Sequence, residues 1–435
     1  MPPGGGAPPR RWALLCLLAV ALPGSTVCLA QVSRGGPPLA GQPAARRHAR
    51  VLFVLHDAGE TFALSGAMRR LAAGGLPVRA LALGQPAGDL LSCRGQSAQC
   101  RPLPSMTLRD LGVNFDVIDG TAGRAQRLPA ADVQAVVEAL RPQVVVTGMN
   151  YAMQLQLGLA LKRESGGAFV AYYDALRLLG SDSDVSADLQ QKVAAQSDGV
   201  WIASSVLWPS TSAPWGHNYR VVGQPTLEEW QDLARQTGAL RAVRRRLFGE
   251  EALAAGLPAA VWFGGYGPGY EAALRCWCEV VRRMSGPRNR AGVRFAHAIH
   301  PGSNYGDLDR KILKEEGVEH LVVLVPEDIP GSAAALACNL TASQGSTGGV
   351  QSVFAGKPAL FLDPARAFRN SLSLGVRIGL VPNAHSAAAA ERAVRKAARG
   401  GWSVDTKRLK AAGIPSNATS QIVRAVQELL SAPSE

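Results

Sequence analysis

The sequence predicts an α/β protein of two domains, each built on a parallel sheet with helices on both faces. The chain has 435 residues, enough for two or three domains, and 47% of them are apolar, so substantial cores can form. Aromatic residues make up only 6%, while 47 glycines and 28 prolines supply many tight turns. Buried strands also alternate with amphipathic helices along most of the chain, which is typical of parallel sheets.

The first 30 residues resemble a secretory signal peptide. An arginine pair at 10–11 precedes an apolar run at 12–22, and Pro-Gly at 23–24 interrupts that run. Cys-Leu-Ala at 28–30, with small residues at its first and third positions, then offers a cleavage site. A cleaved signal is our first interpretation of 1–30, a single-pass signal anchor the second, and an organelle transit peptide the third.

A Gly/Pro-rich segment at 31–48 is expected to be a flexible stem. The signal predicts a secretory or exported protein: the Golgi or ER lumen in a eukaryote, the periplasm or exterior in a bacterium. Export would allow Cys93 and Cys100, which lie in a polar loop, to close a short disulfide loop. No later apolar run is long enough to cross a bilayer, which excludes a multi-pass transporter.

The first folded domain is expected at 49–225. It starts with a buried strand, a helix and a second strand, which together form a βαβ unit. We expect its strands at 49–55, 78–83, 115–118, 142–147, 168–173, 199–203 and 220–222. We expect its helices at 61–73, 106–111, 130–140, 151–164 and 185–196.

A polar, arginine-rich helical connector is expected at 226–256, and the alternation restarts in a second domain at 257–435. The expected strands there are 259–263, 293–299, 320–325, 338–342 and 359–362. The expected helices are 270–284, 308–316, 332–337, 350–355 and a C-terminal helix at 419–431. The architecture we predict is two Rossmann-like, doubly wound domains that face a central cleft.

Ligands of open parallel sheets bind at the carboxyl ends of the strands, and the second domain has informative residues there. Gly264 and Gly265 start a glycine-rich turn that lets backbone approach an anion, although a tight turn alone is the alternative. His300 ends a strand and precedes Pro301, so it can donate to a phosphate oxygen or serve a structural role. His297, inside the same strand, is expected to be structural.

The strongest signal is the segment 343–358. Gly345, Ser346, Thr347 and Gly348 open a helix, whose N–H groups and hydroxyls can cradle a diphosphate. The segment lacks the Gly-Lys-Ser/Thr of a P-loop. Lys357 follows the helix and is expected to point away from the ligand.

Together with 300–301 and 264–269, this segment resembles the nucleotide-binding domain of GT-B-fold glycosyltransferases and UDP-N-acetylglucosamine 2-epimerases. In the first domain 56–60, 147–148 and 223–225 resemble uncharacterised, glycosyltransferase-like bacterial proteins of this fold. The resemblance implies a nucleotide-sugar donor bound by the second domain. It also implies that His300-Pro301 contacts donor phosphate.

One position departs from the resemblance. Many of these transferases place a glutamate in the helix after the diphosphate loop, where it binds the ribose hydroxyls, and this chain has Gln351 there. Gln351 can hydrogen-bond ribose without a charge. The epimerases carry acidic residues just after the matching glutamine, where this chain has Ser352 and Val353, so an epimerase ranks below a transferase.

The candidate catalytic residues lie at the end of the first strand. His56, Asp57 or Glu60 facing the cleft could remove the proton of an acceptor hydroxyl, while Asp57 or Glu60 could instead cap the following helix. Asn150 and Asp174 end later strands and are expected to line an acceptor groove. We expect no cofactor and no bound metal, and we interpret Asp-Ser-Asp at 182–184 as a solvated loop.

The function predicted is transfer of a sugar from a nucleotide-activated donor to an acceptor hydroxyl on a glycan, lipid or protein. The alternatives are an exported, non-catalytic protein that binds a phosphorylated ligand or glycan, and a nucleotide-sugar 2-epimerase. The net charge of +13 agrees with anionic ligands. Nucleic acid is not expected as a partner, because no basic patch is interleaved with aromatic residues.

Overall fold

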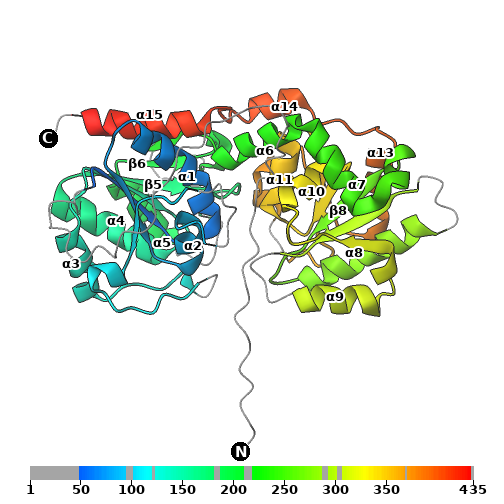
Figure 1. Ribbon diagram of the computed structural model, residues 1–435, viewed down its shortest axis with the longest axis horizontal. Helices are drawn as coiled ribbons and strands as arrows, with labels where there is room; N and C mark the ends of the chain where they lie inside the picture. The colour runs from blue at the N-terminus through cyan, green and yellow to red at the C-terminus, as the bar shows by residue number, and fades with distance from the viewer. Residues whose placement is uncertain are drawn as a thin grey trace, which may run out of the picture.

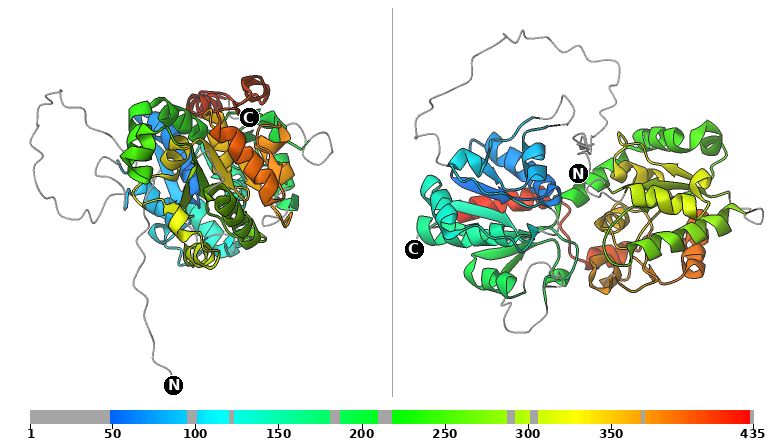
Figure 2. Two further views of the ribbon diagram at one scale, coloured as in Figure 1. Left: turned by 90° about the vertical axis from the view of Figure 1, so that its right-hand side faces the viewer. Right: turned by 90° about the horizontal axis from the view of Figure 1, so that it is seen from below.

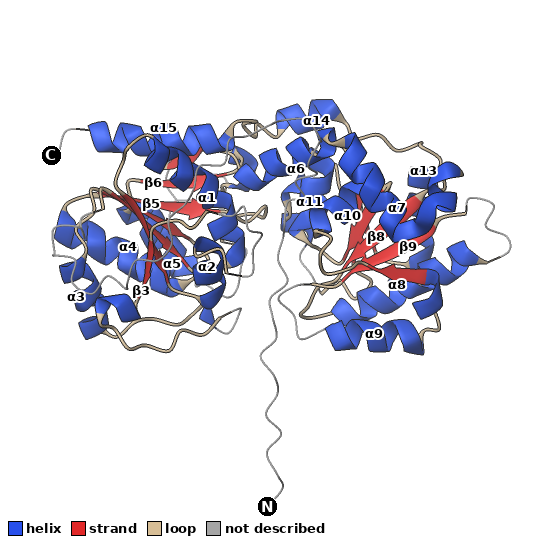
Figure 3. Ribbon diagram, viewed as in Figure 1, coloured by secondary structure: helices blue, strands red, loops and turns tan. Residues whose placement is uncertain are grey.

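The computed structural model shows two domains side by side, each with a central sheet between helices (Figures 1 and 3). It describes residues 49–94, 101–119, 123–180, 187–209, 218–286, 292–300, 306–367 and 370–432. The expected signal, the stem and the Asp-Ser-Asp loop lie outside these ranges, as do Cys100 and Pro301. In the described ranges, no helix has the length and apolar character needed to span a bilayer. Cys93 is disulfide-bonded.

The first domain holds a seven-stranded sheet whose neighbouring strands all run parallel, in the order β3-β2-β1-β4-β5-β6-β7. The strands are β1 (Val51–Leu55), β2 (Val78–Ala82), β3 (Ser105–Thr107), β4 (Val144–Gly148), β5 (Ala168–Tyr173), β6 (Gly199–Ile202) and β7 (Tyr219–Val221). Every residue of β1 and β4 is buried, as expected for central strands covered on both faces. The order reverses between β1 and β4, which is the switch point of the sheet.

Helices cover both faces of this sheet. They are α1 (Ala58–Ala73), α2 (Gln85–Leu91), α3 (Ala130–Ala139), α4 (Ala152–Ser165) and α5 (Ala187–Gln196). Because side chains alternate along a strand, Leu52 and Val54 of β1 enter one core with α3 and α4. Val51, Phe53 and Leu55 enter the other core, with α1.

Two local expectations in this domain were wrong. The helix expected at 106–111 is strand β3 followed by a short 3-10 turn, Arg109–Leu111. Its buried Met106 stands between exposed neighbours, but three residues are too few for that alternation to be recognised in sequence. The strand expected at 115–118 is not a strand, because β3 already occupies the sheet edge, and Ile118 is 48% exposed.

The second domain repeats this plan with a six-stranded parallel sheet in the order β10-β9-β8-β11-β12-β13. The strands are β8 (Ala259–Phe263), β9 (Arg294–Ala298), β10 (Val322–Leu324), β11 (Leu340–Ser343), β12 (Ala359–Leu362) and β13 (Asn383–Ala384). Its helices are α8 (Tyr270–Ser285), α9 (Gly306–Glu315), α10 (Gly331–Ala337), α11 (Thr347–Phe354), α12 (Leu374–Arg377) and α13 (Ala387–Ala398). Its switch point lies between β8 and β11.

The chain crosses between the domains twice. The first crossing consists of α6 (Pro225–Arg235) and α7 (Thr237–Ala254), and the second of α14 (Thr406–Ala411) and α15 (Ala418–Ser431). The sequence placed the C-terminal helix with the second domain, but α15 lies along the first (Figure 1). Its Ile422 and Ala425 are buried in the first domain's core, and Thr419 donates to Glu228 of α6 at 2.7 Å. An apolar stripe predicts that a helix packs, not which domain covers it.

A backbone bridge joins the two domains near the ends of their strands. Leu178 N donates to Leu372 O and Leu374 N donates to Leu176 O, both at 2.8 Å. Beside this bridge, Leu176 and other apolar residues of the first domain share a core with α11 and β12 of the second. The segment after β5 is therefore held against the second domain. The two-lobed arrangement is clear from below (Figure 2, right).

Candidate functional site

The structure places the predicted site residues at the two switch points, where open α/β sheets bind ligands. In the first domain His56 and Asp57 follow β1, Asn150 follows β4, and Asp174 follows the neighbouring strand β5. In the second domain Gly264 follows β8, and the small-residue segment follows β11.

The turn between β1 and α1 is a capping box, so the capping role anticipated for Asp57 and Glu60 exists. Glu60 N donates to Asp57 Oδ1 at 2.9 Å, and the Glu60 carboxylate accepts from His56 N and Asp57 N. Gln154 Nε2 also donates to Glu60 Oε1 at 2.5 Å. Glu60 is fully buried: its Oε1 accepts these bonds, while its Oε2 has no hydrogen-bond partner among the described residues. Of the two carboxylates, Asp57 is therefore the more accessible.

Asp57 and Asp174 lie close together around Gly59. A Cβ atom built on Gly59 would stand 3.4 Å from Asp174 Oδ2 and 3.5 Å from Asp57 Oδ1. Asn150 Nδ2 donates to Asp174 Oδ1 at 2.7 Å, so these two strand-end residues are in contact. Both aspartates are partly buried. The pair is thus anchored by Asn150 and the helix start, yet retains access to solvent.

Burial raises the pKa of all three carboxyls in this cluster, Asp57, Glu60 and Asp174. Their mutual repulsion adds to the rise for Glu60 and Asp174, and the pKa of Asp174 reaches about 7. The charge of Arg124 acts in the opposite direction and lowers the pKa of Asp57 and Asp174. Near neutral pH, Asp174 can therefore accept or donate a proton.

His56 is held as a neutral ring beneath this cluster. It is 1% exposed and stacks on Tyr151, with ring centroids 3.5 Å apart and planes 8° from parallel. Burial lowers the pKa of His56 to about 4, so the imidazole is uncharged at neutral pH. Neither ring nitrogen has a hydrogen-bond partner among the described residues. Its burial favours a role in shaping the site over one as an accessible base.

Arg124 is a site residue that the sequence analysis missed. It hydrogen-bonds the Tyr151 hydroxyl, and its charge acts on Asp57 and Asp174. The chain brings it there because Ala152 N, at the start of α4, donates to Arg124 O at 2.8 Å. It lies in a loop without a motif, so only the folded chain reveals it.

The second switch point is built mainly from small and hydroxyl-bearing residues. Ser346 is the N-cap of α11: its Oγ accepts from Gly348 N at 3.2 Å, while its own N donates to Ser343 Oγ at 3.0 Å. A Cβ on Gly348 would overlap the ring of Phe263 in β8. The small residues therefore let α11 begin directly against β8. Thr347 is exposed at this opening.

Hydrogen bonds tie the neighbouring loops to this opening. Gln344 Nε2 donates to Pro268 O at 2.8 Å, which joins the glycine-rich turn to the segment after β11. Asn370 Nδ2, beside the interdomain bridge, donates to Gln344 O at 2.7 Å. The predicted phosphate-binding residues thus all follow the carboxyl ends of strands β8, β9 and β11: Gly264, Gly265, His300, Gly345, Ser346, Thr347 and Gly348.

His300 lies against the glycine-rich turn. Its ring meets that of Tyr266 edge to face, with centroids 5.0 Å apart, and burial lowers its pKa. The expectation of a structural His297 agrees with the structure. His297 Nε2 lies 2.9 Å from Asp309 Oδ2, and Tyr270 donates to Asp309 Oδ1 at 2.8 Å, all three side chains being buried.

Gln351 and Lys357 lie away from the opening of α11. Gln351 Nε2 donates to Thr226 Oγ1 of α6 at 3.1 Å, across the domain boundary. Lys357 lies within electrostatic reach of Arg244 and Cys338, and Cys338 precedes the amino end of β11. Lys357 is thus at the opposite end of the strands from the site. No group of His, Cys, Asp and Glu suited to a metal ion occurs among the described residues.

No protein-family model matches the chain, and no curated protein matches it. Solved structures do match over nearly the whole fold. A UDP-GlcNAc 2-epimerase from Neisseria meningitidis, bound to UDP-GlcNAc, is 13% identical, covers 87% of this chain and 99% of its own, and has a TM-score of 0.58. The corresponding values for a UDP-GlcNAc 2-epimerase from Methanocaldococcus jannaschii are 12%, 87%, 99% and 0.57.

MurG from Acinetobacter baumannii is 14% identical, with 87% and 99% coverage and a TM-score of 0.53. At these identities the matches establish the fold. They confirm the two-domain GT-B architecture that the sequence motifs predicted.

Proposed function

We propose that this protein is a glycosyltransferase-like enzyme that moves a sugar from a nucleotide-activated donor to an acceptor hydroxyl. One observation carries the proposal. Asp174 starts the segment whose residues 176–178 are bridged to 372–374, and Asn370 beside that bridge bonds Gln344 just before the opening of α11. A proton-accepting carboxylate and an anion-binding helix start are thus held in one connected framework.

The chemistry divides between the two switch points. The acceptor hydroxyl attacks the anomeric carbon, and its proton passes to Asp174 or Asp57. The bond between that carbon and the donor phosphate oxygen breaks, and a nucleoside diphosphate leaves. The N–H groups at the start of α11, the Ser346 and Thr347 hydroxyls and His300 stabilise the negative charge that develops on the phosphate.

A 2-epimerase is the second candidate, and a specific feature favours it. Asp57 and Asp174 stand beside the same glycine, so one can remove a proton from the sugar while the other returns one. The structures from Neisseria meningitidis and Methanocaldococcus jannaschii that match this fold are 2-epimerases. The acceptor then plays no part: the nucleoside diphosphate leaves C1 as the proton is removed from C2, and it adds back to C1 after a proton is returned to the opposite face of C2.

Product analysis separates these functions. The full chain is incubated with UDP-, GDP- and CMP-sugars, with and without pooled glycan, lipid-linked and peptide acceptors, and products are identified by mass spectrometry and NMR. We expect release of the nucleotide only when an acceptor is present. If an epimerised nucleotide sugar forms without acceptor, the protein is a 2-epimerase and not a transferase. If the nucleotide sugar binds but no product forms, the protein is non-catalytic.

The variant test uses Asp174→Asn, with Asp188→Asn on the exposed surface of α5 as the matched control. Loss of a general base costs about 10²- to 10⁴-fold in rate. Because either aspartate can serve as the base, the double variant Asp57→Asn/Asp174→Asn is also measured. Full turnover by that double variant would contradict the assignment of the base.

A further inference from the structure

Arg366 has a backbone conformation that, among the described residues, is found almost only at glycine. Its φ is +52°, in the left-handed region, which costs a side-chain-bearing residue free energy. Every other residue with positive φ in the described ranges is glycine, except Cys93, whose side chain is fixed by a disulfide. An arginine at such a position points to a role for its side chain, because strained residues concentrate at functional sites.

Arg366 follows β12, next to the opening of α11. Ser343 of β11 is paired with Phe361 of β12, so the segment after β12 runs beside the segment after β11. A Cβ on Gly269 would lie 2.7 Å from Ala367 Cβ and 3.4 Å from Ala365 Cβ. The two neighbours of Arg366 therefore pack against the glycine that precedes α8.

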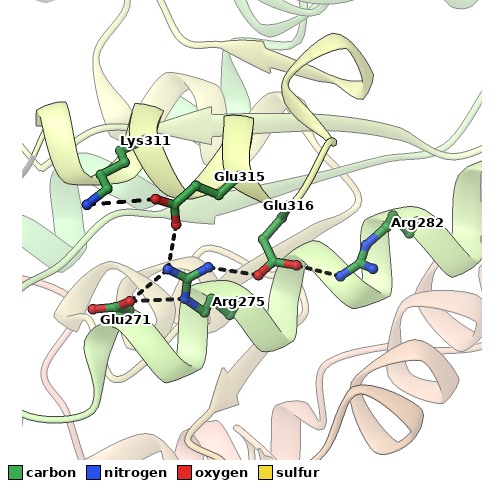
Figure 4. A network of polar contacts seen from close by, with 6 residues as sticks. All are labelled: Glu271, Arg275, Arg282, Lys311, Glu315 and Glu316. Carbon is green, nitrogen blue, oxygen red and sulfur yellow. Dashed lines mark hydrogen bonds and ion pairs between the residues drawn. The ribbon is translucent and has the colours of Figure 1, made fainter.

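Three other basic side chains of the second domain bring no free positive charge to the start of α11. Lys357 lies at the far end of the strands, and burial keeps His300 neutral by lowering its pKa. Arg275 of α8 is committed to Glu271, Glu315 and Glu316, with distances of 2.7–3.0 Å (Figure 4). Arg366 is exposed, and its guanidinium makes no hydrogen bond or ion pair within the described ranges.

We propose that Arg366 binds the diphosphate of the donor. This inference rests on the proposed function. A guanidinium can donate two parallel hydrogen bonds to phosphate oxygens, which a helix start alone does not offer. The positive charge of the guanidinium also stabilises the negative charge that develops on the nucleoside diphosphate as it leaves. The strained backbone is kept because it presents the side chain beside the glycine-rich turn.

The test measures the dissociation constants of pyrophosphate, UDP and uridine by calorimetry. It compares the full chain with Arg366→Gln and with Arg399→Gln, an exposed arginine at the end of α13. We expect Arg366→Gln to weaken pyrophosphate and UDP by about 10- to 100-fold, the range for one lost charge-assisted hydrogen bond. Uridine binding should not change, and Arg399→Gln should behave as wild type.

A second variant guards against misfolding. Arg366→Gly suits the left-handed backbone, so its melting temperature should equal or exceed that of the wild type while diphosphate affinity falls as in Arg366→Gln. Unchanged UDP affinity in both variants would overturn the role of Arg366 and leave the proposed function standing. If pyrophosphate binds in an Arg366-dependent way but no nucleotide binds, the role of Arg366 stands and the proposed function is overturned. Absence of all binding by the wild type would overturn both.

Discussion

The two switch points share one topology but solve different chemical problems. The first gathers Asp57, Glu60 and Asp174, and their burial raises the pKa of each carboxyl. The second gathers glycines and hydroxyls around the start of α11, with Ser346 as its N-cap. Carboxyls whose pKa is raised suit proton transfer, whereas free N–H groups suit binding of an anion. The same strand order thus carries two chemically different sites, and the proposed function assigns the base to the first and the phosphate to the second.

The largest effect is expected from filling the close approach at the first switch point. Gly148→Ala would drive a methyl group into Glu60 Oε2, against which Gly148 packs. We expect a loss of about 1–3 kcal/mol or more in the free energy of unfolding, because the buried capping box must shift. Gly238→Ala is the matched control: nothing lies within 4 Å of its added Cβ on α7, so chemical denaturation should show no loss.

Asp174→Asn tests whether the ionised, buried carboxylate of Asp174 destabilises the folded protein. The pKa of Asp174 is raised in the folded state to about 7, so its contribution to stability is present below its ordinary pKa of 3.8 and is lost as pH rises through 7. The variant should melt about 2–4 °C above wild type at pH 8 and equal it at pH 3.5, for a gain of about 1 kcal/mol. A lower melting temperature at pH 8 would contradict burial as the cause of the shift.

His56 should produce the opposite pH dependence. Its folded pKa of about 4 lies below the ordinary value of 6.5, so its contribution to stability is complete above pH 6.5 and is lost as pH falls toward 4. His56→Phe keeps a ring to stack on Tyr151 and removes the titrating group. Between pH 7 and 4, the melting temperature of the variant should fall less than that of the wild type. If both melting temperatures fall equally, the titration of His56 does not cause the loss of stability in acid.

The smallest effects are expected from removing the two hydroxyl groups at the start of α11, in the second switch point. Ser346→Ala removes the N-cap of α11 and should cost about 1 kcal/mol of stability. Thr347→Ala changes an exposed hydroxyl and should leave stability unchanged. Both should weaken binding of UDP if their hydroxyls contact phosphate. A UDP affinity unaffected by either change would leave only backbone N–H groups, and Arg366, to hold the diphosphate.

Much of this architecture could be predicted because its signals are local. Buried strands such as Val51–Leu55 are continuous apolar runs, and polar residues just after strands, such as Asn150 and Asp174, could be named from position alone. The short β3 could not be predicted, because three residues carry no period. The strand-like run at 115–118 failed for a related reason: composition suited a strand, but the sheet had no edge for it.

The amino-acid sequence by itself determined the alternation of strands and helices and the polar residues at strand ends. It also determined the small-residue segment that opens α11, because each depends on neighbours within a few residues. Only the tertiary structure decided that Arg124 lies at the first switch point and Arg366 beside the second, that Glu60 completes the capping box, and that α15 covers the first domain. These facts depend on contacts between residues far apart in the chain, which no local pattern records.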